Sequence, residues 1–187
     1  LPNWALSGAT SGLFNAAYYW SHVRRSVTGT IAPDPFFFPL DAILEWNKAY
    51  GSRGFTQYQC VVPRASGPAA VREFMERLTK LGAASPLCVI KDCGPQGMGT
   101  LSFPLEGTSI AVDIPVSAEI QRIVDGLNEF IIATGGRIYL TKDRFTTAEH
   151  FRAMEPRLER FEQARAKWDP ARRLRSAQSR RLFGDKA

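Results

Sequence analysis

Two short segments of the sequence carry side chains that could do chemistry. One ends in Tyr139 and Lys142, and the other places Gln57 and Gln59 two positions apart. Residues two apart lie on one face of a strand, so both amides would point the same way. Amides hydrogen-bond hydroxyl groups, and a lysine ammonium can stabilise negative charge that develops during a reaction. This combination is typical of one wall of a polar active site.

Each of these residues also has a plain structural interpretation. The glutamines could bond loops or lie on a solvated face, and a lysine at a strand end is usually just hydrated. Tyr139 and Lys142 are three positions apart and would face opposite sides of a continuous strand. They converge only if the strand ends or bulges near Thr141. Lys91 would end a neighbouring strand and join them if the strands are adjacent.

The bulk composition is that of a globular protein. The chain has 187 residues, of which 44% are hydrophobic and 22% charged. No apolar run approaches the roughly 20 residues that cross a bilayer. Residues 1–12 lack the basic start of a secretory leader. Because the first methionine is Met75, we expect a piece of a longer protein. The cysteine usage described below favours a cytoplasmic one.

The net charge of +6 comes from the C-terminal end. Residues 157–187 hold ten Lys/Arg and four Asp/Glu, whereas residues 1–156 hold fourteen of each sign. The neutral body argues against a nucleic-acid-binding domain. The tail either contacts phosphates or an anionic membrane surface, or is a solvated arm, which is the simpler prediction.

The three cysteines do not follow a metal-binding spacing. Cys88 and Cys93 are separated by four residues and have no nearby histidine, and Cys60 stands alone. We therefore expect no metal site and three small, mostly buried, reduced thiols.

The order of elements predicts an α+β fold. Apolar periodicity indicates strands at 55–62, 87–91, 101–103, 109–114 and 137–141, with helices at 68–81 and from Ser117 to the glycine pair at 135–136. This is the split βαβ arrangement of a ferredoxin-like unit, in which helices cover one face of an antiparallel sheet. The sequence contains no dinucleotide fingerprint and no P-loop.

Three parts are expected along the chain. Residues 1–53 form a loop-rich aromatic lead-in, in which the prolines of 32–39 exclude a regular helix and 42–50 is helical. Three consecutive phenylalanines there must be covered by the core or by a neighbouring domain. Residues 54–145 form the α+β domain. Residues 146–187 form helices and the basic tail, starting with a capping box at Thr146 and divided at Pro156.

Several motifs occur together in an order that resembles one family, and the similarity spans roughly residues 14–183. The chain is similar to the C-terminal half of FAD-dependent oxidases of the vanillyl-alcohol-oxidase superfamily, nearest to its sugar-oxidising members. The motifs are Phe38-Pro39-Leu40-Asp41, Trp46-Asn47, Gly54-Phe55-Thr56-Gln57-Tyr58-Gln59, Leu101-Ser102-Phe103-Pro104, Ala111-Val112-Asp113-Ile114-Pro115, Gly135-Gly136-Arg137-Ile138-Tyr139-Leu140-Thr141-Lys142-Asp143 and Met154-Glu155-Pro156-Arg157.

The resemblance implies roles for the candidate residues. Such enzymes join an N-terminal FAD-binding domain to a substrate domain that caps the flavin. By the family pattern Lys142 would be catalytic and lie at flavin and substrate, and Tyr139 would contact the flavin. Gln59 and Gln57 would face the substrate hydroxyls, with Lys91 nearby. The expected partners are therefore a sugar or polyol and the FAD domain of the same polypeptide.

Two positions depart from the nearest members of that family. Ser109 stands where the ribose oxidases of the superfamily have asparagine, and Ala111 where they have cysteine. Both would line the substrate pocket, so the substrate can differ while the chemistry is kept. The alternative is a self-contained ferredoxin-like module that binds a ligand or a protein on its bare sheet without redox activity.

Overall fold

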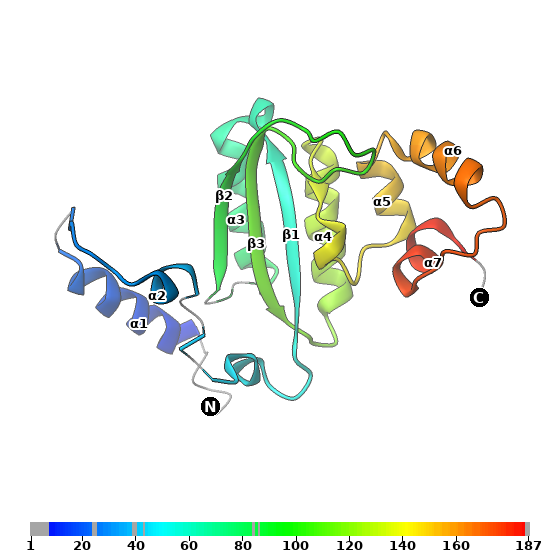
Figure 1. Cartoon of the computed structure of the whole chain (residues 1–187). Coiled ribbons are helices and arrows are strands. Elements are labelled where there is room, and N and C mark those ends of the chain that lie inside the picture. The colour runs from blue at the N-terminus through cyan, green and yellow to red at the C-terminus, as the bar shows by residue number, and fades with distance from the viewer. Residues whose placement is uncertain are drawn as a thin grey trace. The chain divides into compact units, whose positions relative to one another are not determined.

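A computed structural model describes the chain at residues 8–23, 26–38, 41–42, 44–83, 85 and 87–185 (Figure 1). The chain divides into two compact units, Leu1–Phe55 and Thr56–Ala187. Within the described residues, no helix is both long and apolar enough to span a membrane.

The second unit is built on a four-stranded antiparallel sheet with the strand order β2-β3-β1-β4. Strand β3 thus lies between β1 and β2, which are joined through a helix. This is the split βαβ arrangement, so the predicted α+β, ferredoxin-like class is confirmed. The strands are β1 (Phe55–Pro63), β2 (Cys88–Cys93), β3 (Gly107–Pro115) and β4 (Arg137–Ile138).

Two helices cover one face of the sheet, and among the described residues of the second unit no helix covers the other face (Figure 1). Helix α3 (Gly67–Lys80) buries Phe74 and Leu78, and helix α4 (Ile120–Ala133) carries a longer apolar stripe. The buried members of that stripe recur at the three- and four-residue spacing of an amphipathic helix. They are Ile120, Ile123, Val124, Leu127, Phe130 and Ile131. The helices meet the alternate buried residues of β1 and β3 in one core.

A polar chain runs through this core and ends beside β4. The Tyr58 hydroxyl donates to Asn128 Oδ1 at 2.9 Å, and Asn128 Nδ2 donates to the Thr146 hydroxyl at 3.1 Å. Asn128 and Thr146 are fully buried. Burial raises the pKa of the Tyr58 hydroxyl well above its ordinary value. The hydroxyl thus stays protonated and able to donate.

Replacing Asn128 with leucine should lower the free energy of unfolding by about 2–4 kcal/mol, because two buried hydroxyl groups lose their partner. Urea denaturation measures the change. Glu129→Leu, at an exposed position of the same helix, is the control and should change stability by no more than about 0.5 kcal/mol. Wild-type stability of Asn128→Leu would show that the chain of hydrogen bonds contributes nothing.

The C-terminal helices α5 (Ala148–Met154), α6 (Leu158–Trp168) and α7 (Ala177–Phe183) follow the sheet. Pro156 lies between α5 and α6, so the predicted division is confirmed, although Pro156 precedes the first turn of α6. Asp169 ends α6 by accepting hydrogen bonds from the Arg173 and Leu174 amides at 2.7 and 2.9 Å. These two bonds lower the pKa of its carboxyl group.

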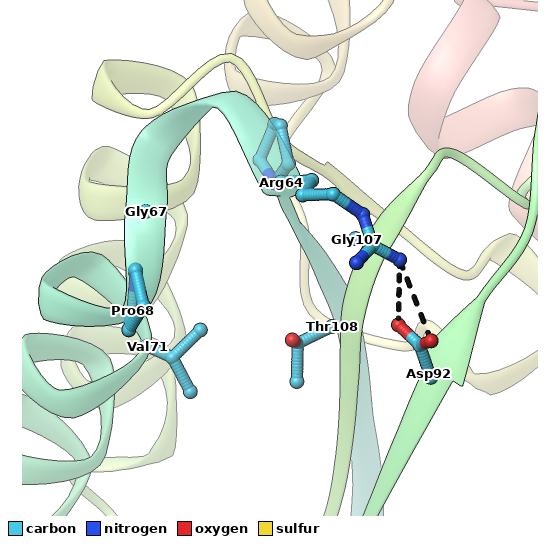
Figure 2. Close-up of a pocket in the computed structure, with 8 residues that line it drawn as sticks. Arg64, Gly67, Pro68, Val71, Asp92, Gly107 and Thr108 are labelled. Atoms are coloured by element: carbon cyan, nitrogen blue, oxygen red, sulfur yellow. Dashed lines mark hydrogen bonds and ion pairs between the residues drawn. The ribbon is translucent and has the colours of Figure 1, made fainter.

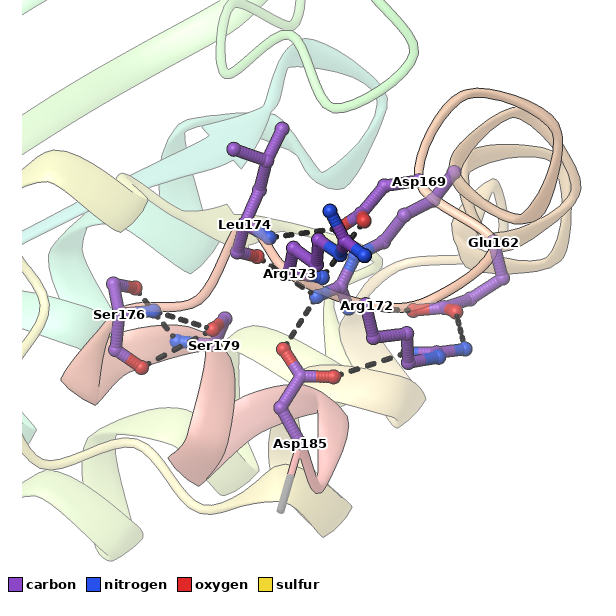
Figure 3. Close-up of polar contacts among 9 residues, drawn as sticks. Glu162, Asp169, Arg172, Arg173, Leu174, Ser176, Ser179 and Asp185 are labelled. Carbon is purple, nitrogen blue, oxygen red and sulfur yellow. Dashed lines mark hydrogen bonds and ion pairs between the residues drawn. The ribbon is translucent and has the colours of Figure 1, made fainter. Parts of the chain in front are cut away.

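Acidic side chains hold much of the basic tail in place (Figure 3). The carboxylate of Asp185, whose side chain is fully buried, lies 2.5 Å from Arg165 and 3.1 Å from Arg172. Arg172 also pairs with Glu162 at 2.5 Å. The Arg165 hydrogen bond is the main cause that lowers the pKa of Asp185. The part of the tail around Arg172 is exposed, as predicted, but these ion pairs hold it against the rest of the second unit and it is not a free arm.

Three further predictions need correction. Residues 101–103 do not form a strand, and β4 stops at Ile138 instead of continuing to Thr141. Thr147, not Thr146, caps α5, where its side chain accepts from the His150 amide. Thr146 is instead buried in the core, where its hydroxyl accepts a hydrogen bond from Asn128.

The first unit contains α1 (Gly8–Ser21), α2 (Pro33–Phe37) and a 3₁₀ turn, Trp46–Tyr50. The aromatic segment 14–20, whose composition fits either a helix or a strand, is helical. The proline-rich run does form one helical turn, contrary to expectation, because both prolines fall at its start, where a missing N–H costs nothing. The helix predicted at 42–50 is wrong apart from the 3₁₀ turn. Leu44 is 88% exposed, and the predicted core position Ile43 lies outside the described residues.

Aromatic side chains of the first unit remain on its surface. Phe36, Phe37 and Phe38 are 62%, 68% and 58% exposed, so the described side chains of the first unit do not bury them. Other apolar side chains of α1 are at least 60% exposed, namely Leu13, Phe14, Tyr18, Tyr19 and Trp20. A surface of this kind is typical of a protein interface.

Candidate functional site

The helix-free face of the sheet collects most of the candidate residues. In β1, Tyr58 and Cys60 point into the core, so Gln57 and Gln59 point to the opposite face, where both are half-buried. In β3, Ile110 is buried in the core, and its neighbours alternate with it. Ser109 and Ala111 therefore share the face of the glutamines.

A hydrogen bond links the two central strands on this face. Gln59 Nε2 donates to the Ser109 hydroxyl at 3.1 Å, and Ser109 is 1% exposed. Lys91 lies directly opposite Ser109 in the β2–β3 register and is exposed. Ala111 lies opposite Val89. The pairing places Gln59, Ser109 and Lys91 in one row across three strands.

Tyr139 and Lys142 reach the same region because β4 is short. The Tyr139 amide donates to the Gln59 carbonyl at 2.8 Å, so Tyr139 is the neighbour of Gln59 in the sheet. The backbone then turns into a 3₁₀ helix, Leu140–Lys142, in which the Lys142 amide donates to the Tyr139 carbonyl at 2.9 Å. Residues three apart in such a turn lie on one side. The convergence that a continuous strand would forbid is therefore allowed.

The ammonium group of Lys142 has a distinctive environment. The side chain is half-buried, and within the described residues its ammonium group makes no hydrogen bond or ion pair. Most other half-buried cations of this unit have carboxylate partners, as Arg157 and Arg181 do. Lys142 is thus a cation at the sheet edge that is available to a bound molecule.

The connection between β2 and β3 adds residues that the sequence did not indicate as site residues. Its Phe103 ring packs against the Tyr139 ring with centroids 4.7 Å apart. Arg137 and Arg157 each donate to the Ser102 carbonyl at 3.0 Å and so hold this connection beside β4. Arg157 lies in a motif of the family resemblance, but neither spacing nor periodicity marks its role.

Arg137 is a cation that is almost completely buried from solvent. It is 9% exposed, and its Nε atom is buried without a hydrogen-bond partner. Burial, together with the nearby positive charge of Arg157, lowers the pKa of Arg137. A cavity of about 110 Å³ lies beside it, lined also by Phe103, Tyr139 and Glu155.

A separate pocket of about 280 Å³ lies at the far end of β1 (Figure 2). Pro68 and Val71 of α3, Thr108 of β3, and Arg64 line it. The Arg64 guanidinium pairs with Asp92 and with Glu106, both at 3.1 Å. Its charge is thus already neutralised, and none of the predicted site residues lines this pocket.

The three cysteines are unpaired. Cys60 is fully buried, and burial strongly raises the pKa of its thiol. Cys88 and Cys93 are half-buried at the two ends of β2, and burial also raises the pKa of Cys88. This agrees with the expected inert thiols.

Comparison with known proteins shows that the sequence of this chain is similar to that of an oxidase. Over 150 residues, or 79% of its length, it is 42% identical to decaprenylphosphoryl-β-D-ribose oxidase of Mycolicibacterium smegmatis. The chain is a relative of this oxidase. The predicted resemblance to this kind of enzyme is thereby confirmed. No protein-family profile matches the chain.

The similarity covers only part of each relative. The chain matches 32% of decaprenylphosphoryl-β-D-ribose oxidase. It also matches 38% of a Streptomyces coelicolor protein, described only as lying in the mprA 5′ region, with 31% identity over 142 residues. It thus spans about a third of the length of the curated relatives. The roles of Gln57, Gln59, Lys91, Ser109 and Ala111 stay predictions, as do those of Tyr139 and Lys142.

Proposed function

We propose that this chain is the substrate-binding part of an FAD-dependent oxidoreductase that oxidises an alcohol group of a sugar or polyol. The observation that carries the proposal is Lys142, which has no partner among the described residues, beside Tyr139 and Gln59 in a chain 42% identical to an oxidase named for a ribose derivative. That relationship also makes a binding module without redox activity the weaker alternative.

The residues present fit a flavin at the helix-free face. A flavin is planar and aromatic, and it gains negative charge when it is reduced. The half-buried Tyr139 ring would lie against it, and the free ammonium of Lys142 would face that charge. When bound, the flavin would supply the acceptor for the hydride from the alcohol carbon.

The side chains of this unit would bind and orient the alcohol. Gln59 Nε2 is used by Ser109, so its Oε1 atom is directed by that bond and can accept from a substrate hydroxyl. Gln57 and Lys91 would add a donor on either side. Lys142 would hold the alcohol oxygen and stabilise the negative charge that the acceptor gains with the hydride, and the hydroxyl proton would leave to water. The small Ala111 would leave room for a substituent.

Two further parts of the proposal concern partners and location. The exposed phenylalanines of the first unit would pack against an FAD-binding domain of the same polypeptide. A cytoplasmic location is supported by the unpaired cysteines. Contact with a membrane surface would fall to those tail arginines that are not held by carboxylates.

The test is the visible absorption spectrum of the protein expressed from its complete reading frame. We expect flavin bands that bleach when a sugar or polyol is added without oxygen. The compound that bleaches them fastest identifies the substrate class. A colourless protein that stays colourless with added FAD would overturn the proposal and leave only the fold in common with the oxidase.

A further inference from the structure

The turn that carries Lys142 has little of its own to hold it. It is a single 3₁₀ turn, Leu140–Lys142, without a fully buried side chain, and the half-buried Leu140 is its contact with the hydrophobic core. Short segments with few buried contacts open locally at low cost. A catalytic side chain, however, must be held within a fraction of an ångström of its working position. Something outside the turn must therefore fix it.

Helix α7 supplies that support through Gln178. The side-chain amide of Gln178 donates to the Leu140 carbonyl at 2.5 Å and to the Asp143 carbonyl at 3.5 Å. These two carbonyls lie immediately before and after the pair Thr141-Lys142. One side chain thus bridges the two ends of the segment, across a sequence separation of 38 and 35 residues.

Arg181, one helical turn further on, holds the same segment. Its guanidinium pairs with the Asp143 carboxylate at 2.7 Å and donates to the carbonyl of Thr146. The Asp143 carboxylate also accepts from the Thr146 amide at 3.0 Å. The Asp143 and Arg181 side chains are 6% and 28% exposed, so the pair is shielded from water and stronger than a surface ion pair.

The segments on both sides of these contacts, Thr146 on one side and α7 on the other, are themselves held in place. Thr146 is fixed to the core through Asn128, and α7 is fixed through buried Leu182 and through the Asp185 pairs with Arg165 and Arg172 (Figure 3). Both anchors are rigid parts of the second unit. The turn therefore lies between two fixed supports instead of at a free sheet edge.

We propose that α7 is a positioning element for Lys142 and that Gln178 and Arg181 are its positioning residues. This rests on the function proposed above for Lys142. Gln178 acts on the main chain at the two ends of the turn, and Arg181 acts on Asp143 and Thr146, which follow it; neither would touch the substrate. Their loss would let the turn open and would move the ammonium group out of register with the alcohol.

The experiment compares Gln178→Leu and Arg181→Met with Arg180→Met in the complete protein. Arg180 is on the same helix, is exposed, and makes no side-chain contact with the turn. Hydrogen exchange at the amides of Lys142 and Asp143 should speed up about tenfold or more in the first two variants only. The amides of β1 and β3 serve as the measure of intact folding.

The second measurement is the single-turnover rate of alcohol oxidation. It should fall about tenfold or more in Gln178→Leu, with unchanged flavin content, and Arg180→Met should match wild type. In a Lys142→Ala background, Gln178→Leu should have no further effect on the rate, because both changes remove one function.

The outcomes separate the two proposals. Unchanged exchange at the turn, or faster exchange with an unchanged rate, would overturn the positioning role. A further loss in the Lys142→Ala background would do so too, because α7 would then act by another route. Wild-type turnover of Lys142→Ala would refute the catalytic lysine, while the exchange data would still report whether α7 holds the turn.

Discussion

Lys142→Ala should reduce turnover to a small residual rate while the protein stays folded and keeps its flavin. Because no described contact depends on the Lys142 ammonium group, its removal should leave the free energy of unfolding nearly unchanged. The rate should fall about 100-fold or more, as when one preorganised charge-stabilising group is removed from an active site. Anaerobic mixing with the substrate, followed by the flavin absorbance, measures this rate.

A matched lysine tests whether the effect is specific. Lys80 lies at the exposed end of α3, and Lys80→Ala removes the same charge far along the chain. It should leave rate and flavin content as in wild type. Lys142→Arg keeps the charge but changes its shape and reach, so it should restore only a small part of the rate. Turnover at the wild-type rate in Lys142→Ala would refute the assignment.

The largest loss of stability is expected from Gly107→Ala. Gly107 begins β3 where that strand passes closest to β1. A Cβ atom there would lie 2.1 Å from the Val62 carbonyl oxygen and 2.9 Å from the Arg64 amide nitrogen. Because one is a backbone atom of β1 and the other a backbone atom of the residue that follows β1, no side-chain rotation relieves the clash. We expect the two central strands to separate locally, with a loss of about 3 kcal/mol or more.

Chemical denaturation of Gly107→Ala and Gly94→Ala tests this. Gly94 lies in the same β2–β3 connection, and a Cβ atom there would meet nothing within 4 Å. Gly94→Ala should be neutral or slightly stabilising, since alanine reduces the freedom of the unfolded chain. Equal stability of the two variants would mean that β1 and β3 adjust to the added methyl group. Because Ser109 follows two residues later, Gly107→Ala should also weaken substrate binding.

The sheet and its helices could be predicted because their signals are local. The alternation of β1 and the apolar stripe of α4 each depend on neighbouring residues, and together they determine the split βαβ order. The open face followed from the same alternation. Gln57 and Gln59 could therefore be placed on one face, whereas only the family resemblance placed Ser109 near them, and the hydrogen bond between Gln59 and Ser109 could not be foreseen.

The errors occur where distant residues decide the local structure. The apolar run 101–103 resembles a strand, but Arg137 and Arg157 occupy the Ser102 carbonyl that a strand partner would need. The sequence favoured Thr146 as the cap because Glu149 follows three positions later, but the buried Asn128 binds the Thr146 hydroxyl and Thr147 caps the helix instead. Charge counts alone described the tail as an arm, because counting does not show which carboxylates fold back onto which arginines.

The grip of Gln178 on main-chain oxygens has a consequence for how such a site can change over time. Gln178 binds the carbonyl oxygens of Leu140 and Asp143, so its hydrogen bonds do not depend on the identity of the side chains between them. The side chain at position 142 can thus be replaced by another reactive group while the hydrogen bonds that hold the turn stay intact. The supporting contacts can therefore be kept while the residue at position 142 is substituted, so that a new specificity needs only a single substitution.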